Sequence, residues 1–426
     1  MNARAARTAA AERIRRAYDT ELGSVRAFLP ERVPIDVLPP LLQPYLNATG
    51  ELTLRYPVGG GVRGWLDGLF GRRAPDVVAL LPALSEPERQ RLMTVLSVLA
   101  HAYRWDSVPP AQDRFAERRI QLPAGLREPW QALAELQESP CVGTTWSMHL
   151  CNWRMTDRPG GSSYRPEELT PQNVRVAHQW LLPPYDAHLE RFSLTFVLME
   201  AAGAGALLAL VEATEACANN DPDDALQALG RLHAGIRAVA ASFTANVRAA
   251  HIAPEVWLEL VQPTFAWAAE TVDGPLEGPS GMQLGTIQSL DAALGVSGGS
   301  DLAEQTRHAR RYLPAAHHRF LHTLERAGPL IPTYVAASGE PDLRDRFNAC
   351  LKALGTFRVA HAVRGARYLS AGRHGESSRV STGLGTAWRP DQPAAPSSPG
   401  HDDDPVDIFR RAMAERIDET HGAALG

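Results

Sequence analysis

The chain has 426 residues, of which 44% are hydrophobic and 21% are charged, and its formal net charge at pH 7 is −5. This apolar fraction supplies a sizeable core, and the length predicts two domains. The net charge is small and both signs are mixed, so no positive potential attracts phosphates and nucleic acid is not an expected partner. The four cysteines form no CxxC pair, which excludes a disulfide scaffold and a thiolate zinc site and favours a cytoplasmic location.

Helix signals dominate from the first hundred residues onward. Ser85-Glu86-Pro87-Glu88 is a capping box with proline in the first turn, and apolar residues follow it every three or four positions. Asp221-Pro222 and Ala253-Pro254 start further helices in the same way. Only residues 51–58 have the alternation of a strand. The expected fold class is therefore all-α.

The longest apolar run, residues 192–211, has Glu200 near its middle. A charge at that depth costs too much free energy in lipid, so we expect a buried core helix and no membrane partner. The N-terminal residues also lack the apolar core of a signal peptide.

Helix signals continue in the C-terminal third of the chain. Ser300 caps a helix over 301–313, Pro314 begins a second one, and Pro341 opens a long helix that reaches residue 369. Residues 370–404 are rich in Gly, Ser, Pro and Asp and have no hydrophobic period, and an amphipathic helix follows them. A loop tethered by helices at both ends is typical of an active-site lid, and we expect one here.

Loop composition also predicts the domain boundary. Residues 156–184 contain Pro-Gly-Gly-Ser-Ser and several further prolines, which is typical of a linker. We expect a small, mostly helical N-terminal domain with this linker at 1–183. A larger helical domain at 184–426 would then include the lid and the last helix.

One histidine on the long C-terminal helix is unusual. His361 continues the apolar stripe of Leu354 and Phe357, at spacings of seven and four residues. A histidine that faces a core needs partners for its ring nitrogens; on its own this pattern is more often a hydrogen-bonded core residue than a metal ligand. Arg358, one turn earlier, favours haem, because haem iron binds imidazole and haem propionates bind cations.

Several segments resemble the indoleamine 2,3-dioxygenase family, in the right order over most of the chain. Gly-Pro-Ser-Gly-Met-Gln at 278–283 is similar to its Gly-Gly-Ser-Ala-Gly-Gln, and Arg-Arg-Tyr-Leu-Pro-Ala-Ala-His at 310–317 to its Arg-Arg-Tyr-Met-Pro-Pro-Ala-His. Residues 348–354, with Arg358 and His361, resemble the segment that carries the haem ligand. The resemblance implies a helical protein that binds haem b, ferrous in its active form, and uses O2 as co-substrate.

The resemblance also assigns roles to the residues that would bind the cofactor. It implies that His361 is the iron ligand and that Arg358 and Asp291 form the pair that links this side of the haem to a propionate. Ser280 and Gly281 match the segment that lines the haem edge and the substrate pocket.

Further matches concern the substrate side. Phe192 and Trp257 correspond to aromatic positions over the haem, and Thr382 corresponds to a lid threonine that contacts the substrate. The alternatives are core packing for the aromatic residues and simple solvent exposure for Thr382.

Five positions depart from the family pattern, and one of them is Leu384 inside the glycine run of the lid. Gln262 stands where the family has an arginine that holds the amino-acid carboxylate. An amide has neither the positive charge nor the bidentate hydrogen bonding of a guanidinium. Phe196 stands in place of a small serine, and Met148 and His149 replace a cysteine and a valine of the indole pocket. We therefore expect a reshaped pocket in which His149 is a candidate hydrogen-bond or proton donor, or else a histidine bonded to backbone.

Three functions are consistent with these residues. The first is C2–C3 dioxygenation of an indole, tryptophan or a derivative, with no acid–base residue required. The second, motivated by Gln262 and His149, is a monooxygenase or ring-rearranging enzyme of secondary metabolism. The third is a haem-binding protein without catalysis. We favour the first, with a small aromatic substrate as partner; the sequence identifies no reductant.

Overall fold

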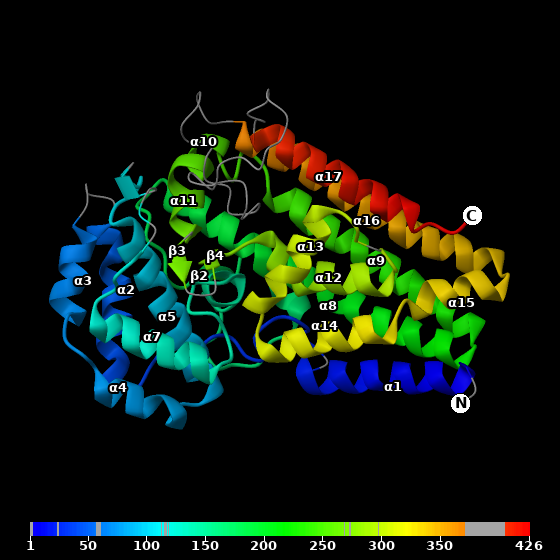
Figure 1. The fold of residues 1–426 in the computed structure, drawn as a ribbon, viewed down its shortest axis with the longest axis horizontal. Helices are drawn as coiled ribbons and strands as arrows, with labels where there is room; N and C mark the ends of the chain where they lie inside the picture. The colour runs from blue at the N-terminus through cyan, green and yellow to red at the C-terminus, as the bar shows by residue number, and fades with distance from the viewer. Residues whose placement is uncertain are drawn as a thin grey trace.

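The computed structural model describes residues 3–23, 25–56, 61–111, 113–114, 117, 119–267, 269–271, 274–296, 298–370 and 405–426. In these ranges the chain is a helical assembly with two short two-stranded sheets, so the predicted all-α class is confirmed. Figure 1 shows the helices that follow α1 gathered at one end and the longer helices packed side by side at the other. Of the predicted lid, only residue 370 is described; Thr382 and Leu384 lie outside the described residues.

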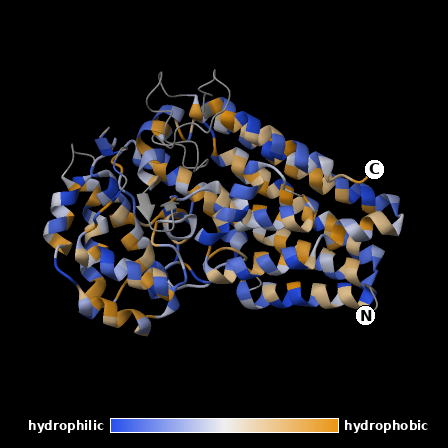
Figure 2. Ribbon diagram, in the orientation of Figure 1, coloured by the Kyte–Doolittle hydropathy of each residue, from blue (hydrophilic) through white to orange (hydrophobic). Residues whose placement is uncertain are grey.

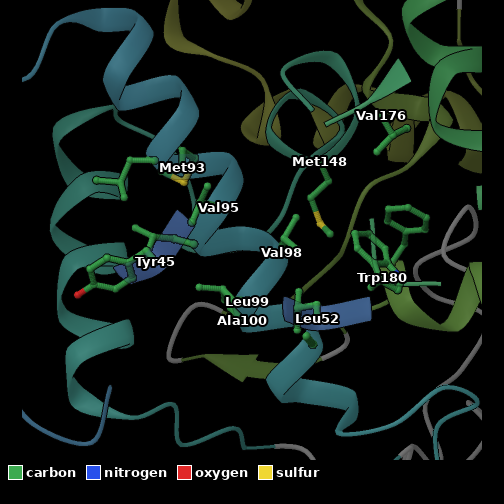
Figure 3. Packing of buried hydrophobic residues seen from close by; sticks show 14 of the residues in the cluster. Tyr45, Leu52, Met93, Val95, Val98, Leu99, Ala100, Met148, Val176 and Trp180 are labelled. Atoms are coloured by element: carbon green, nitrogen blue, oxygen red, sulfur yellow. The ribbon is translucent and has the colours of Figure 1, made fainter. Parts of the chain in front are cut away.

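The first group of helices surrounds α5 (Glu86–Trp105). Ser85 and Glu88 form the predicted capping box, and every residue of α5 from position 91 onward is buried. Figure 3 shows part of the resulting core. The surrounding elements are η1 (Pro40–Leu42), α2 (Gln43–Arg55), α3 (Val62–Phe70), α4 (Pro75–Leu80), η2 (Leu81–Ala83) and α7 (Ala124–Leu136).

The strand predicted over residues 51–58 is wrong, because residues up to 55 belong to α2. Tyr45, Ala48 and Leu52 are buried at helical spacing, and α2 packs on α5. Leu54, which a strand would place with Leu52 on one face, is 72% exposed. The tertiary contact of the helical face outweighs the local alternation of side chains.

Two antiparallel strand pairs are described. β1 (Trp153–Met155) pairs with β2 (Val174–Val176), and β3 (Ala269–Thr271) pairs with β4 (Gly274–Leu276). The predicted linker contains β2 and the 3-10 turn η4 (Pro166–Glu168), and it buries apolar side chains in the first core cluster. It is therefore a packed segment of the fold. The division into domains at residue 183 stays a prediction.

The longer helices are arranged around α8 (Asp186–Asn219), which packs along α9 (Pro222–Asn246). Asp221 and Ser300 accept hydrogen bonds from backbone N–H groups at the starts of α9 and α13 (Asp301–His308), as predicted. The helix predicted over 301–313 is divided into α13 and the 3-10 turn η7 (Ala309–Tyr312). The other members are α1 (Ala3–Glu21), α12 (Gly285–Ala293), α13 (Asp301–His308), α14 (Ala315–Ala327), α15 (Leu330–Ser338), α16 (Pro341–Leu369) and α17 (Pro405–Gly422).

By length and composition, α8 is the one described helix that could cross a membrane, but 78% of its most apolar stretch is buried inside the protein. Its Glu200 is fully buried against α12, as expected for a core helix. The outer helices differ: Figure 2 shows hydrophobic and hydrophilic residues alternating along α1 and α17. This agrees with the amphipathic helix predicted at the C-terminal end.

Short helices connect the two groups. The π-helix η3 (Trp146–Leu150) precedes β1, and a second π-helix, η5 (Trp257–Val261), joins α10 (Pro254–Val256) to α11 (Gln262–Phe265). The 3-10 turn η6 (Gly281–Gln283) leads into α12. Single π-turns occur frequently at functional sites: η5 begins with Trp257, and η3 carries His149, whose ring stacks on that of Phe196.

Candidate functional site

A cavity of about 270 Å³ lies between α8, α12, α16, α17 and η5. Most of its wall is aromatic or aliphatic, and its charged residues come from α12, α16 and α17. Eight of the predicted site residues line it: Phe192, Phe196, Trp257, Ser280, Gly281, Asp291, Arg358 and His361.

His361 lines this cavity from α16 among three phenylalanine rings. The centroids of Phe243, Phe357 and Phe409 lie 5.6, 6.2 and 5.8 Å from its ring centroid. In the described part of the chain, neither ring nitrogen has a hydrogen-bond partner. Burial, with a smaller effect of Arg358, lowers the pKa of His361 to about 4. The ring is therefore neutral at pH 7, with one nitrogen lone pair free to bind a metal.

An ion network forms the charged part of the wall. Arg358 and Arg416 both donate to the carboxylate of Asp291, and Arg416 also donates to Glu419 at 2.6 Å. Glu419 in turn accepts from the backbone N–H groups of residues 299–300. The side chains of the two arginines are only 4% and 8% exposed. The network therefore joins α12, α16 and α17 with balanced charges.

Arg416 is a wall residue that the sequence analysis missed. Phe409, Met413 and Arg416 recur at helical spacing on α17 and line the cavity together. The pattern shows an amphipathic helix, but nothing local identifies its partner as α16. The packing is close, because a Cβ at Gly365, one turn after His361, would lie 2.4 Å from the Phe409 ring.

Ser280 and Gly281 are held at the wall by contacts with the segment before η3. The hydroxyl of Thr145 donates to the Ser280 carbonyl at 2.8 Å and accepts from the Ser280 N–H at 3.0 Å. The side-chain oxygen of Gln283 accepts from the Thr145 N–H at 2.7 Å. A Cβ at Gly281 would meet no heavy atom within 4 Å, so the wall leaves open space at this point.

These residues fit a haem group. His361 offers an unpartnered imidazole, the aromatic wall suits a flat macrocycle, and the guanidinium groups of Arg358 and Arg416 in the wall would supply cations for propionates. Among the described residues, no three His, Cys, Asp or Glu side chains gather as a metal site. Haem iron takes most of its ligands from the porphyrin, so a single histidine from the protein suffices to hold it.

Aromatic side chains cover another part of the wall. The Phe192 ring centroid lies 5.4 Å from that of Phe196, one turn along α8, and 6.0 Å from that of Trp257 at the start of η5. Trp257 also contacts Tyr368 of α16, with centroids 5.5 Å apart. The rings therefore form an aromatic surface suited to a planar ligand.

Three predicted pocket residues do not line this cavity. Met148, His149 and Gln262 are 0%, 1% and 2% exposed, respectively. Figure 3 shows Met148 inside the apolar core close to Val98. Their roles toward a substrate stay predictions.

His149 lies behind Phe196 as seen from the cavity. The two rings are stacked, with centroids 4.3 Å apart and an interplanar angle of 3°. Burial, with a smaller effect of His101, lowers the pKa of His149 to about 3. At neutral pH His149 can donate a hydrogen bond from its single N–H, but it is not a protonated acid.

Known proteins resemble this chain along most of its length. The family model described as indoleamine 2,3-dioxygenase matches residues 17–383. Indoleamine 2,3-dioxygenase acdA of Aspergillus candidus is 25% identical over 394 residues, which cover 83% of this chain and 89% of that protein. Indoleamine 2,3-dioxygenase nanC of Aspergillus nanangensis is 24% identical over 402 residues, covering 83% and 86%. Human indoleamine 2,3-dioxygenase 2 is 23% identical over 311 residues, covering 69% and 72%.

Proposed function

The chain belongs to the indoleamine 2,3-dioxygenase family, a family of haem-dependent dioxygenases, and we propose that it oxidises an indole-type substrate in the cavity beside His361. We propose haem b as the cofactor, held by His361, with Arg358, Asp291 and Ser280 at its edge. The favoured reaction is C2–C3 dioxygenation of tryptophan or a derivative.

The observation that carries this proposal is the neutral His361, unpartnered among the described residues, in a cavity that also has an aromatic wall. Haem, when bound, supplies the activation of O2 that no side chain provides. The apolar rings of Phe192, Phe196 and Trp257 exclude water and orient a planar substrate. Asp291 is engaged by two guanidinium groups and is therefore not a free base for the reaction.

A second reaction on the same cofactor is insertion of a single oxygen atom or rearrangement of the ring. The observation that favours it is that His149 and Gln262 are buried and uncharged. These two residues differ from the family pattern, and a pocket that differs from the family pattern suits a substrate with a different side chain. The mass of the product formed under 18O2 separates the reactions. Two retained 18O atoms support dioxygenation, and one supports the alternative.

Absorption spectroscopy tests the cofactor assignment. The full chain, expressed with a haem precursor, is expected to give a histidine-ligated haem spectrum, ferric as prepared and shifted when reduced under carbon monoxide. His361→Ala should lose this spectrum, whereas His322→Ala, which removes an exposed histidine from α14, should keep it. Unchanged haem content in His361→Ala would refute the ligand assignment. A wild-type protein that takes up no haem would remove both oxygenase functions and favour a non-catalytic protein.

A further inference from the structure

Three buried polar atoms behind the aromatic wall have no hydrogen-bond partner among the described residues. They are Nε2 of His101, Nδ1 of His149 and Oε1 of Gln262. Each of the three side chains is at most 2% exposed. Buried polar atoms in folded proteins almost always have a partner, so three in one region require a bound water or a bound ligand group to pair with them.

All three side chains lie at α11: Gln262 belongs to this helix, and the two histidines contact it. Nδ1 of His101 lies 3.2 Å from the carbonyl oxygen of Thr264, which only accepts, so Nδ1 carries the proton and Nε2 is left as an acceptor. Gln262 is the first residue of the same short helix. The ring of His149 lies 4.6 Å from that of Phe265, the last residue of the helix.

Gly143 lies between His101 and the residue that precedes His149. A Cβ at this glycine would lie 2.5 Å from Nε2 of His101 and 2.3 Å from the sulfur of Met148, the residue before His149. His101 is also the neighbour that acts electrostatically on His149. The unpartnered nitrogen of His101 therefore faces the segment that carries His149.

One layer of rings separates these residues from the cavity. Phe196 lines the cavity on one side and stacks on His149 on the other. Phe192 also lines the cavity and lies 5.6 Å from Phe265. A phenylalanine ring makes no hydrogen bond, so a rotamer change of Phe196 breaks stacking and apolar packing contacts but leaves no unpaired polar group.

The three side chains themselves carry no charge at neutral pH. Burial lowers the pKa values of both His101 and His149 to about 3, and Gln262 is neutral. The nearby guanidinium of Arg104 donates to three backbone carbonyls, at residues 114, 117 and 267, and lies 3.8 Å from the Glu117 carboxylate. Burying an ionised carboxylate or ammonium here, without a free counter-ion, is unfavourable.

We propose that His101, His149 and Gln262 form a buried subsite for an uncharged polar substituent of the indole substrate, reached when Phe196 turns away from His149. This inference rests on the proposed function and names its substrate class: an indole whose side chain ends in a neutral amide. The two N–H groups of a primary amide match the acceptors on His101 and Gln262. Its carbonyl oxygen matches the N–H of His149 in the tautomer protonated on Nδ1.

Calorimetric binding to the haem-loaded full chain at pH 7.5 tests the subsite. The ligands are indole-3-propionamide, indole-3-propionate of nearly equal shape, and 3-methylindole, which has no polar substituent. Wild-type protein is expected to bind the amide at least tenfold more tightly than the carboxylate. Equal affinities, or tighter carboxylate binding, would overturn the subsite.

Matched variants identify the groups responsible. His149→Phe keeps an aromatic ring, and Gln262→Leu keeps the approximate shape; each is expected to weaken amide binding about tenfold and to leave 3-methylindole unchanged. His322→Phe, the same replacement on an exposed turn of α14, should change neither. If His149→Phe does not fold, Gln262→Leu and the ligand series on wild-type protein still test whether the subsite binds the amide.

Two results distinguish the failure of each proposal. Binding of 3-methylindole without amide preference, and without an effect of either variant, would mean that an internal water satisfies the three atoms, and only the subsite would fall. Failure of every indole to bind wild-type protein would overturn the proposed function and the subsite with it. Phe196→Ala should quicken amide association, and an unchanged rate would refute the gating role of this ring.

Discussion

A single buried carboxyl group fixes one wall of the cavity. Glu200, fully buried in the middle of α8, accepts hydrogen bonds from the N–H and hydroxyl of Thr286 in the first turn of α12. The helices meet closely there, because a Cβ at Gly203 would lie 2.6 Å from the Thr286 side chain. Asp291 follows on the same helix, so the position of the ion network depends on this contact.

Glu200 is expected to make stability depend on pH. Burial raises its pKa from 4.5 to about 7, so the stabilisation of its protonated form is complete below about pH 4.5 and is lost as pH rises through about 7. At 1.36 kcal/mol per pKa unit, up to about 3 kcal/mol is involved. Glu200→Gln should remove this loss when urea unfolding is compared at pH 5 and pH 8. Glu212→Gln, on the same helix but partly exposed, is the control; equal pH slopes in all three proteins would contradict the assignment.

Gln262 is the residue whose replacement should alter ligand charge preference. Gln262→Arg places a guanidinium in a site that is now buried and uncharged, so we expect a less stable free protein. A ligand carboxylate then supplies the missing partner, and tryptophan should bind at least tenfold more tightly. Titration of wild-type and variant protein with tryptophan measures this. Unchanged affinity would mean that residue 262 does not face the ligand.

The starts of helices were predicted most readily from the sequence. Which helices pack against one another was not predicted. The cap at Ser85, the Asp221 cap and the amphipathic stripe of α17 depend on residues a few positions apart, and the structure confirms them. The strand predicted at 51–58 failed because α5, far along the chain, selects the helical face of α2. Arg416 was missed for the same reason, since its contact with Asp291 spans 125 residues.

The last helix should contribute to cofactor retention. Arg416→Leu removes one of the two guanidinium partners of Asp291 and the side-chain partner of Glu419. Breaking a largely buried ion pair in this way typically costs about 3 kcal/mol. We expect a lower melting temperature and at least tenfold faster haem loss to a haem acceptor in solution. Arg410→Leu, on an exposed turn of the same helix, should change stability by less than about 1 kcal/mol. Equal haem loss from the two variants would show that Arg416 does not support the cofactor site.

At the scale of the whole molecule, the buried side chains form two large clusters that meet at α8. One contains α2, α5 and α7 with the N-terminal half of α8, and the other contains α1, α9 and α16 with the remainder of α8. The cavity adjoins this junction, since Phe196 packs against both clusters. The family resemblance identified eight of its wall residues in advance, but no sequence pattern could show that Phe196 stacks on His149 and separates it from the cavity.

Cofactor binding is therefore expected to protect one part of the molecule more than the rest. A ligand that binds only the folded state stabilises it by RT ln(1 + [L]/Kd), about 2.7 kcal/mol at a free concentration of one hundred times Kd. The wall comes from α8, α12, α16 and α17, so hydrogen exchange should slow most in these helices when haem is added and least in α3 and α4, which do not touch the cavity. The same measurement on His361→Ala is the control and should show no haem-dependent change. Uniform slowing of every helix would instead indicate that haem acts on global unfolding alone, and slowing confined to α3 and α4 would place its site elsewhere.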